Sequence, residues 1–301
     1  MITTQSGVLL IDKPVGPSSA QVVHRVKTIL GAKKVGHLGT LDPFASGLLL
    51  IGVNEGTKIA DIFLSGAKSY VGVMVLGVET DSQDCTGKVI ETRSVPPVGG
   101  AELTMLESKF TGDLTQVPPM FSALKKDGVR LYQLARQGKE IPREARAIRI
   151  KALTLRQLSE TEIEFEVICS RGTYVRTLAA DMGTELGCGA HLKTLRRSAC
   201  DHLNISEALT PDELEERCAG GPPPLLSLRS ALSHLPAVAW RSQLISRLRL
   251  GQQEVLEQLG PPHEGEKLLA ILDPRGTLVA LAEWTEDVAA GRWRLARIFK
   301  E

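Results

Sequence analysis

A single carboxylate is the residue in this sequence whose type and setting most strongly suggest chemistry. Asp42 lies in the stretch GHLGTLDPFASGLLLIG, residues 36–52, and is followed by Pro43. Neither a serine–histidine pair nor a cluster of metal-type ligands surrounds it there, so the chemistry it suggests is that of one nucleophilic or stabilising carboxylate. The glycines of this stretch leave room for a ligand. The alternative is an Asp-Pro turn whose side chain only caps the backbone.

A carboxylate among apolar neighbours needs a fixed positive partner. Leu38, Leu41 and Phe44 are expected to exclude water around Asp42, and desolvation favours the protonated form of a carboxyl group. The segment SRGTYVRTLAAD, residues 170–181, offers Arg176 in the first turn of a predicted helix. An arginine keeps its charge and can hold a carboxylate in two-point geometry. The alternative is a surface ion pair, worth about 0–1 kcal/mol.

A strongly basic stretch predicts contacts with phosphate groups. Residues 121–151, named here the basic segment, contain nine lysines and arginines and three acids, a local net charge of +6 in a chain of net charge +1. Arg136 and Arg143 are the candidate phosphate contacts within it, and Arg196 is the candidate in the basic stretch 189–200. The alternative for the basic segment is a solvated helix face.

The elements that must position these residues read as α+β. A strand is expected from Gly7, then a helix capped by Ser18 with Gln21 in capping-box spacing. Further strands are predicted at 69–78 and 161–170, and further helices at 101–110, after Gly172 and after Thr210. A Pro–Gly-rich break at 220–226 precedes short strands near the end of the chain, which indicates a small β-rich C-terminal domain.

Composition narrows the class of protein. The 301 residues are 43% hydrophobic and 24% charged, as in a soluble globular protein. Five cysteines without CxxC spacing indicate reduced thiols rather than disulfides or a zinc site. The first residues lack a basic region before an apolar stretch, and no apolar run approaches the ~20 residues of a membrane helix. We therefore expect a cytoplasmic protein that uses no cofactor and no metal.

Five blocks of sequence, in this order, resemble the TruB-type tRNA pseudouridine synthases. They are LLIDKPVGPSS, GHLGTLDPFASGLLLIG, KSYVGVMVLGVETDSQDCTG, QVPPMFSALKKDGVRLYQLARQGKEIPREAR and CSRGTYVRTLAADMGTELGCGAHLKTLRRSA. The resemblance implies an enzyme that isomerises the uridine at position 55, in the T-loop of tRNA. It implies a catalytic domain at 1–232 with a mixed, largely antiparallel sheet, a thumb insertion at about 121–150, and a PUA-like RNA-binding domain at 235–301.

The resemblance also assigns roles to residues by position. Asp42 matches the nucleophilic aspartate, Tyr70 the tyrosine that stacks on the flipped base and is a candidate for the later proton transfer, and Arg176 the arginine that pairs with the aspartate. Contacts with the substrate are implied at further positions, which are His37, Tyr174, Leu195 and Lys13. The chain departs from the family pattern at Phe121, where a tyrosine is usual, so one hydroxyl group is missing near the thumb.

The partner expected from the resemblance is the T-arm of tRNA. Because the guide-RNA-dependent relatives lack the thumb, we expect an enzyme that needs no guide RNA, protein partner or membrane and acts as a monomer. One rival interpretation is an RNA-binding or RNA-folding protein without activity, which would not need the acid, the tyrosine and the arginine. A nucleoside or base hydrolase would need a second carboxylate close to Asp42. A third rival is the same reaction on another RNA.

Overall fold

The structure is a computed structural model, and it describes residues 3–126, 128–286 and 291–300. The first part of the chain contains β1 (Gly7–Lys13), α1 (Ser19–Leu30), β2 (Val35–His37), β3 (Ser46–Val53), the 3-10 helix η1 (Asn54–Ile59), α2 (Ala60–Ser65), β4 (Lys68–Leu76), β5 (Val78–Thr80), β6 (Val89–Thr92), α3 (Gly100–Lys109) and β7 (Gly112–Gln116). The middle part contains β8 (Lys125–Lys126), β9 (Val129–Arg130), α4 (Leu131–Ala135), β10 (Arg146–Gln157), β11 (Glu162–Cys169), α5 (Val175–Glu185), β12 (Ala190–Cys200), β13 (Leu203–Asn204), η2 (Ile205–Glu207), α6 (Pro211–Gly220) and α7 (Leu228–Ala231). The last part contains β14 (Ala237–Ala239), α8 (Ser242–Arg249), η3 (Gln253–Gln258), β15 (Leu268–Leu272), β16 (Leu278–Thr285) and β17 (Arg292–Ile298).

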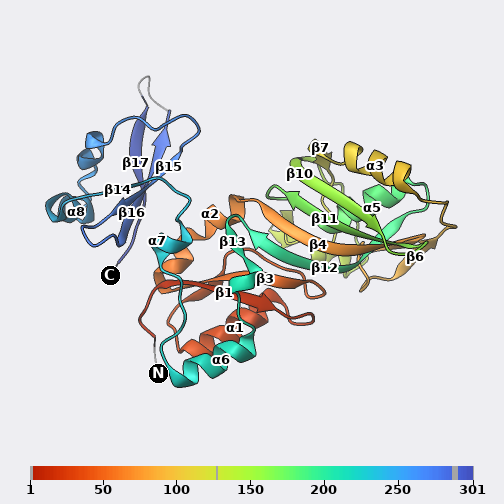
Figure 1. Ribbon diagram of the computed structural model, residues 1–301, viewed down its shortest axis with the longest axis horizontal. Coiled ribbons are helices and arrows are strands. Elements are labelled where there is room, and N and C mark those ends of the chain that lie inside the picture. The colour runs from red at the N-terminus through yellow and green to blue at the C-terminus, as the bar shows by residue number, and fades with distance from the viewer. Residues whose placement is uncertain (1–2, 127, 287–290, 301) are drawn as a thin grey trace.

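One large mixed sheet runs through most of the molecule (Figure 1). Its strand order is β1-β3-β12-β4-β11-β10-β7, with β2 paired to β3 and β13 paired to β12. Strands β12 and β3 pair in parallel, whereas the other neighbours in this order pair antiparallel. The expected α+β class with a mixed, largely antiparallel sheet is therefore confirmed.

Local sequence signals account for several of these elements. At the start of α1, the Ser18 side chain accepts a hydrogen bond from the backbone of Gln21, and the Gln21 side chain accepts one from the backbone of Ser18, so the predicted capping box is present. The expected strand at 161–170 is β11, in which Ile163 and Phe165 face the core and are at most 1% exposed.

The basic stretch 189–200 lies inside the large sheet. Its residues 190–200 form β12, between β3 and β4, and two of its basic side chains are paired with acids. Lys193 forms an ion pair with Glu162, and Arg196 forms a bidentate pair with Asp12. These pairs form across the sheet between residues distant in sequence, which local charge counting does not detect.

The C-terminal strands form a separate small sheet in the order β14-β15-β16-β17 at one end of the molecule (Figure 1). It packs on its own core, which includes Trp240, Leu248 and Trp293. The chain end is tied back to η1 by hydrogen bonds from Lys58 to the carbonyl of Ile298 and from the backbone of Lys300 to Glu55. The domain limits 1–232 and 235–301 stay a prediction. Among the described residues, no helix is both long and apolar enough to span a bilayer.

Candidate active site

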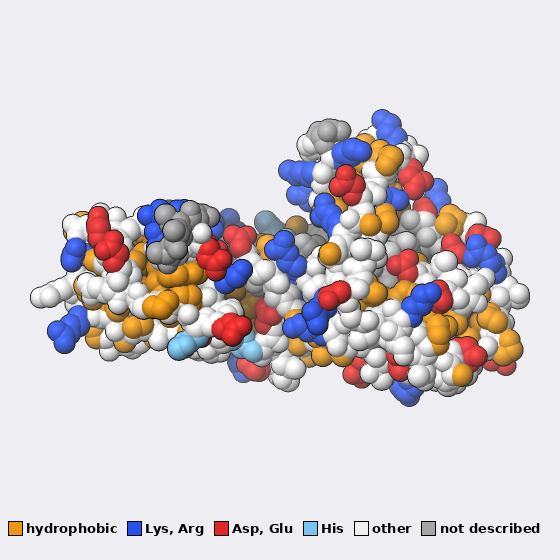
Figure 2. Space-filling view, turned by 90° about the horizontal axis from the view of Figure 1, so that it is seen from above, with side chains coloured by type: hydrophobic (Ala, Val, Ile, Leu, Met, Phe, Trp, Pro, Cys, Tyr) orange, Lys and Arg blue, Asp and Glu red, His pale blue; other side chains and the backbone are white. Residues whose placement is uncertain are grey.

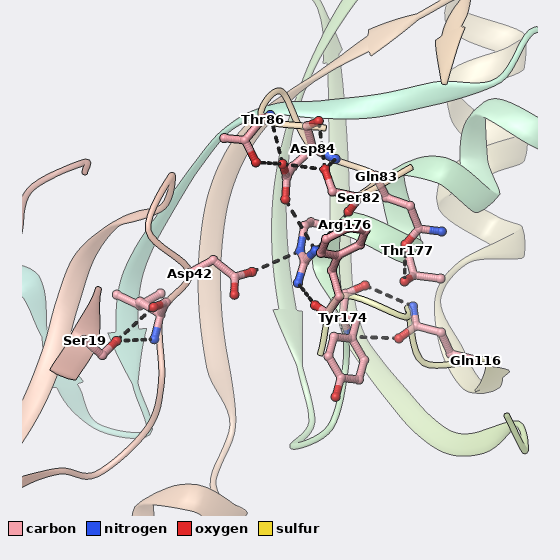
Figure 3. A network of polar contacts seen from close by, with 12 residues as sticks. Ser19, Asp42, Ser82, Gln83, Asp84, Thr86, Gln116, Tyr174, Arg176 and Thr177 are labelled. Atoms are coloured by element: carbon pink, nitrogen blue, oxygen red, sulfur yellow. Dashed lines mark hydrogen bonds and ion pairs between the residues drawn. The ribbon is translucent and has the colours of Figure 1, made fainter. Parts of the chain in front are cut away.

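The loop that carries Asp42, residues 38–45, joins β2 to β3 and is anchored by a serine from another element. Ser19, in the first turn of α1, accepts a hydrogen bond from the N–H of Leu41 and donates one to its carbonyl, both at 2.8 Å (Figure 3). Ser19 is 3% exposed, so this two-point contact is shielded from water. The residue before Asp42 is therefore fixed at both of its backbone polar groups.

Lys13 anchors the other side of the same loop. Its side chain is fully buried, and its ammonium group donates to three backbone carbonyls at 2.8, 2.9 and 3.4 Å, those of Pro14, Pro17 and Pro43. Burial lowers the pKa of Lys13 to about 8, although nearby Asp42 acts in the opposite direction. This burial favours a role of Lys13 in holding the Asp42 loop, and its contact with the substrate stays a prediction.

Arg197 of β12 holds the start of the loop. It is 2% exposed and donates to the backbone carbonyls of three residues, Gly39, Thr40 and Leu48. Gly47 makes this close approach possible, because it has φ +103 and a Cβ atom there would lie 2.4 Å from the Arg197 carbonyl oxygen. Sequence reasoning did not single out Arg197 and missed this structural role.

Arg176, in the first turn of α5, is the positive partner of Asp42. Its Nε atom lies 3.0 Å from Oδ2 of Asp42, and the arginine side chain is 6% exposed (Figure 3). The other nitrogens bind elsewhere: Nη1 donates to the carbonyl of Ser82 at 2.9 Å, and Nη2 donates to the carbonyl of Phe121 at 2.8 Å. The contact with Asp42 is thus through one nitrogen rather than the two-point geometry expected, and it is not a surface ion pair.

Asp84 is a second carboxylate at this arginine, and sequence reasoning did not single it out. Its Oδ2 atom lies 3.4 Å from Nη1 of Arg176, and it is 4% exposed. Its Oδ1 atom accepts from the hydroxyl of Ser82 and from both the N–H and the hydroxyl of Thr86. The run TDSQDCTG, with hydroxyl residues two positions before and after Asp84, is the local signal that indicates such a buried, self-bonded aspartate.

Opposing effects act on the ionisation of Asp42. Burial raises the pKa of its carboxyl group, and the charge of Asp84 adds to this, whereas the contact with Arg176 and the charge of Lys13 lower it. The side chain nevertheless keeps 40% of its surface exposed, so water still reaches the carboxylate in the free protein. The apolar neighbours Leu38, Leu41 and Phe44 are all buried, at most 8% exposed.

The aromatic residues predicted for the site come from two different elements. Tyr70 lies in β4, directly opposite Arg197 in β12 and Val167 in β11. Tyr174 immediately precedes α5 and lies beside Arg176 (Figure 3). Both are half-buried, and burial raises the pKa of each phenol, so both hydroxyl groups are protonated at neutral pH.

Buried polar atoms near these residues lack a partner within the described part of the chain. The clearest of them is Nδ1 of His37. Burial lowers the pKa of His37, and the charge of Arg197 lowers it further, so the ring is neutral near pH 7. Unpaired buried polar atoms are costly unless a ligand or water satisfies them. They are therefore candidate substrate contacts, as the sequence predicts for His37.

The other predicted contacts are less accessible. Leu195 of β12 is 7% exposed and belongs to the main hydrophobic core. Arg196 keeps 47% of its side chain exposed but is bound to both oxygens of Asp12. Contact of Arg196 with RNA stays a prediction. It requires that Arg196 leaves Asp12, or that it binds a phosphate group while it is still paired with Asp12. Among the described residues, no group of three or more His, Cys, Asp or Glu side chains is arranged to hold a metal ion.

The basic segment is not one long helix face. It contains the β8–β9 hairpin and the short α4, and its last residues form the start of β10. Lys125, Lys126 and Arg130 of the hairpin are exposed. Arg136 is exposed and stacks over the ring of Tyr132 at 5.6 Å, and Arg143 is bound to Glu140 at 3.2 Å. Figure 2 shows lysine and arginine side chains gathered on a lobe that rises above the rest of that face.

Comparisons with known proteins agree over nearly the whole chain. Residues 27–175 match the family described as TruB family pseudouridylate synthase (N terminal domain), and residues 176–221 match the tRNA pseudouridylate synthase B C-terminal domain. A tRNA pseudouridine synthase B from Geobacter sulfurreducens is 42% identical over 97% of this chain and 99% of its own length. A protein of the same description from Geotalea uraniireducens is 42% identical over 98% of this chain and 96% of its own.

Solved structures agree with the fold. A chain from a Cbf5-Nop10-Gar1 complex superposes with a TM-score of 0.74 at 25% identity, covering 98% of this chain and 85% of that one. A chain from the archaeal box H/ACA sRNP Nop10-Cbf5 complex gives a TM-score of 0.69 at 22% identity, covering 98% of this chain and 86% of that one. The second likeness bears on the fold alone.

Proposed function

Because the chain belongs to the TruB family of pseudouridylate synthases, we propose that it isomerises uridine to pseudouridine in tRNA, at position 55 of the T-loop. The observation that carries the proposal is the contact of 3.0 Å between Asp42 and the buried Arg176. The two residues lie in the two matched family regions, and the Asp42 side chain keeps 40% of its surface exposed. A carboxylate oriented in this way fits a reaction that needs one acid.

The chemistry requires one bond to break and one to form. The C1′–N1 glycosidic bond of uridine breaks, uracil turns, and a C1′–C5 bond forms. The proton on C5 then leaves and N1 takes up a proton, so the product is an isomer of the substrate. Asp42 attacks C6 of the ring, attacks C1′ of the sugar, or removes a C2′ proton to give a glycal, and these three paths stay open. Each uses the carboxylate in its ionised form, which the guanidinium of Arg176 favours.

The target base must leave its stack to reach Asp42. Extrusion of a base costs a few kcal/mol. Stacking on the ring of Tyr70 contributes roughly 1–3 kcal/mol per base and offsets part of this cost. The entering nucleotide also displaces water from Asp42, whose side chain is 40% exposed in the free protein. That displacement protects the detached uracil from loss and strengthens the electrostatic interactions of the site.

The exposed bases of the basic segment are proposed to hold the T-arm through its phosphate groups. Lys125, Lys126 and Arg130 extend from a hairpin whose neighbouring residue Phe121 is bound by Arg176, so the RNA-binding surface and the acid are close in the fold. We propose that the C-terminal unit, residues 235–301, adds further RNA contacts. The protein is proposed to act as a monomer without guide RNA or a protein partner.

The test is incubation of the protein with an unmodified tRNA transcript, followed by chemical mapping of pseudouridine. Conversion at position 55 alone, without added metal or nucleotide, is the expected result. Binding without conversion would instead identify an RNA-binding protein that has no activity, and conversion of another RNA would change the substrate.

The Asp42→Asn variant tests the acid directly. We expect it to lose conversion and to bind tRNA within about tenfold of wild type, because asparagine keeps the shape and can still accept from Arg176. Asp113→Asn is the matched control, since Asp113 is 77% exposed and lies 3.6 Å from Arg149 at the surface. Because burial raises the pKa of Asp42, the wild-type rate should fall on acidification at a pH above the ordinary aspartate pKa. Normal yield from Asp42→Asn would exclude the proposed role.

A further inference from the structure

Gln116 occupies the point where the basic segment leaves the sheet. It is the last residue of β7 and pairs with Arg146, the first residue of β10. Residues 117–145 therefore form an excursion between two adjacent strand ends. Gln116 is 4% exposed, although glutamine is a residue type usually found at the surface. A buried amide at this place needs partners for both of its polar atoms.

Both partners are backbone groups of one residue. Oε1 of Gln116 accepts a hydrogen bond from the N–H of Tyr174 at 2.8 Å, and Nε2 donates one to the carbonyl of Tyr174 at 3.1 Å (Figure 3). The two residues are 58 positions apart in the sequence. This two-point contact fixes both the position and the rotation of the Tyr174 backbone, two residues before Arg176.

The contact replaces a local helix cap. In α1 and α6 the N–H of the N-cap residue is bound by the side chain three positions later, Gln21 or Glu213. Tyr174 is the N-cap of α5, and within the described residues its helix has no side-chain cap of this kind. The residue three positions later, Thr177, donates its hydroxyl to Gln83 instead. The start of α5 is thus held from β7 rather than from within the helix.

A second contact joins the same two regions. Phe121, five residues after Gln116, accepts a hydrogen bond at its carbonyl from Nη2 of Arg176. Both ends of the short stretch 116–121 are therefore attached to the first turn of α5. A displacement of this stretch would move the backbone that carries Arg176 and the guanidinium that contacts Asp42.

We propose that Gln116 is a positioning residue for the reaction, which holds Arg176 against Asp42 and links that pair to the RNA-binding basic segment. The inference rests on the proposed function. Gln116 does not touch the reacting atoms; it acts through the backbone of Tyr174. Its loss should therefore reduce the rate of the chemical step while leaving RNA affinity almost unchanged, since the bases of the hairpin do not depend on this contact.

The experiment compares two substitutions with one control. Gln116→Leu removes both hydrogen bonds, and Gln116→Glu keeps an acceptor for the Tyr174 N–H but opposes the Tyr174 carbonyl with a second acceptor. Glu107→Leu is the control, because Glu107 accepts from the backbone N–H of Leu155 at 2.7 Å and so also bridges two elements, α3 and β10. For each variant, the single-turnover rate of pseudouridine formation at saturating tRNA and the tRNA dissociation constant are measured.

We expect the Gln116 variants to lose roughly 10- to 100-fold in single-turnover rate, as small misplacements of catalytic groups do. Their tRNA dissociation constants should stay within about threefold of wild type, and the control should keep its rate. The rate of Gln116→Glu relative to wild type should rise as the pH is lowered, because a protonated carboxyl group can again donate to the Tyr174 carbonyl. Equal rates for the Gln116 variants and wild type would overturn the proposal. A rate deficit of Gln116→Glu that does not change with pH would overturn it as well.

Hydrogen exchange gives a readout that does not require activity. The Tyr174 amide should exchange faster in Gln116→Leu than in wild type, whereas the Leu155 amide should not. Unchanged protection of the Tyr174 amide in Gln116→Leu would overturn the proposed hold of Gln116 on the Tyr174 backbone, even if the rates differ. If Gln116→Leu fails to fold, Gln116→Glu carries the same comparisons. If the wild-type protein converts no uridine, the proposed function is wrong. The hydrogen-exchange result then still decides whether Gln116 holds the Tyr174 backbone.

Discussion

Replacing Arg176 by lysine is the sharpest test of the site, because it keeps the charge and removes the geometry. The guanidinium has four partners on three different segments: it lies 3.0 Å from Asp42 and 3.4 Å from Asp84, and it donates to the carbonyls of Ser82 and Phe121. The two carbonyls are bound by different nitrogens. A lysine offers a single nitrogen, so at least one carbonyl loses its donor.

The size of the effect follows from burial. A buried carbonyl left without a donor costs about 1–3 kcal/mol, and a hydrogen bond to a charged group contributes about 1.5–3 kcal/mol. With Arg176 only 6% exposed, we expect Arg176→Lys to lower the free energy of unfolding by about 3 kcal/mol. The loss of orientation at Asp42 should lower the single-turnover rate at least ~100-fold, since each tenfold corresponds to about 1.4 kcal/mol.

The assay pairs urea unfolding with release of tritium from tRNA labelled at C5 of uridine. Arg25→Lys is the matched control, because Arg25 also contacts two carboxylates, Asp212 and Glu215, but is 43% exposed. The control should change stability by less than about 0.5 kcal/mol and leave the rate unchanged. An Arg176→Lys variant within threefold of wild type in rate, and as stable, would refute the reasoning that the fork geometry matters.

Two further predictions concern basic residues. Burial lowers the pKa of Lys13 from 10.5 to about 8, so between these pH values the folded state binds fewer protons than the unfolded state. Over this range the contribution of Lys13 to the free energy of unfolding should rise with pH by about 3 kcal/mol. Urea unfolding at pH 7.5 and pH 10 should show that Lys13→Met lacks this contribution; an identical pH dependence in the variant would contradict it. Replacing Lys125, Lys126 and Arg130 together by glutamine should weaken tRNA binding and lower its salt slope by up to about 3, whereas the same change at exposed Lys33, Lys34 and Arg217 should not. A wild-type affinity that barely responds to salt would contradict phosphate binding by the hairpin.

Local patterns in the sequence were sufficient for elements whose cause is local. The capping boxes at Ser18 and Thr210 and the alternation through Ile163 and Phe165 depend on spacing within a few residues, and each is present in the structure. Residue type offered Arg176 as a partner for Asp42 but left a surface ion pair open. Family resemblance assigned the pair, because a separation of more than a hundred positions carries no local signal.

Long-range contacts explain what sequence reasoning missed. Lys13 was expected to contact the substrate and Arg197 was not singled out, but both are at most 2% exposed and bind backbone carbonyls of the Asp42 loop. Whether a basic side chain meets phosphate or a carbonyl depends on which strands become neighbours. Gln116 gave no signal either, because its partner Tyr174 is brought close only when β7 and α5 are assembled.

The place of β12 in the sheet has a consequence for how the chain is made. This strand spans residues 190–200, yet it lies between β3 and β4, which are translated long before it. A nascent chain stopped on the ribosome ahead of residue 190 would hold two half-sheets with open edges at β3 and β4, and such edges invite mispairing and chaperone binding. Arg197 arrives on the same late strand, so its contacts with the backbone around Asp42 form only after β12 has been made, later than those of Lys13 and Ser19.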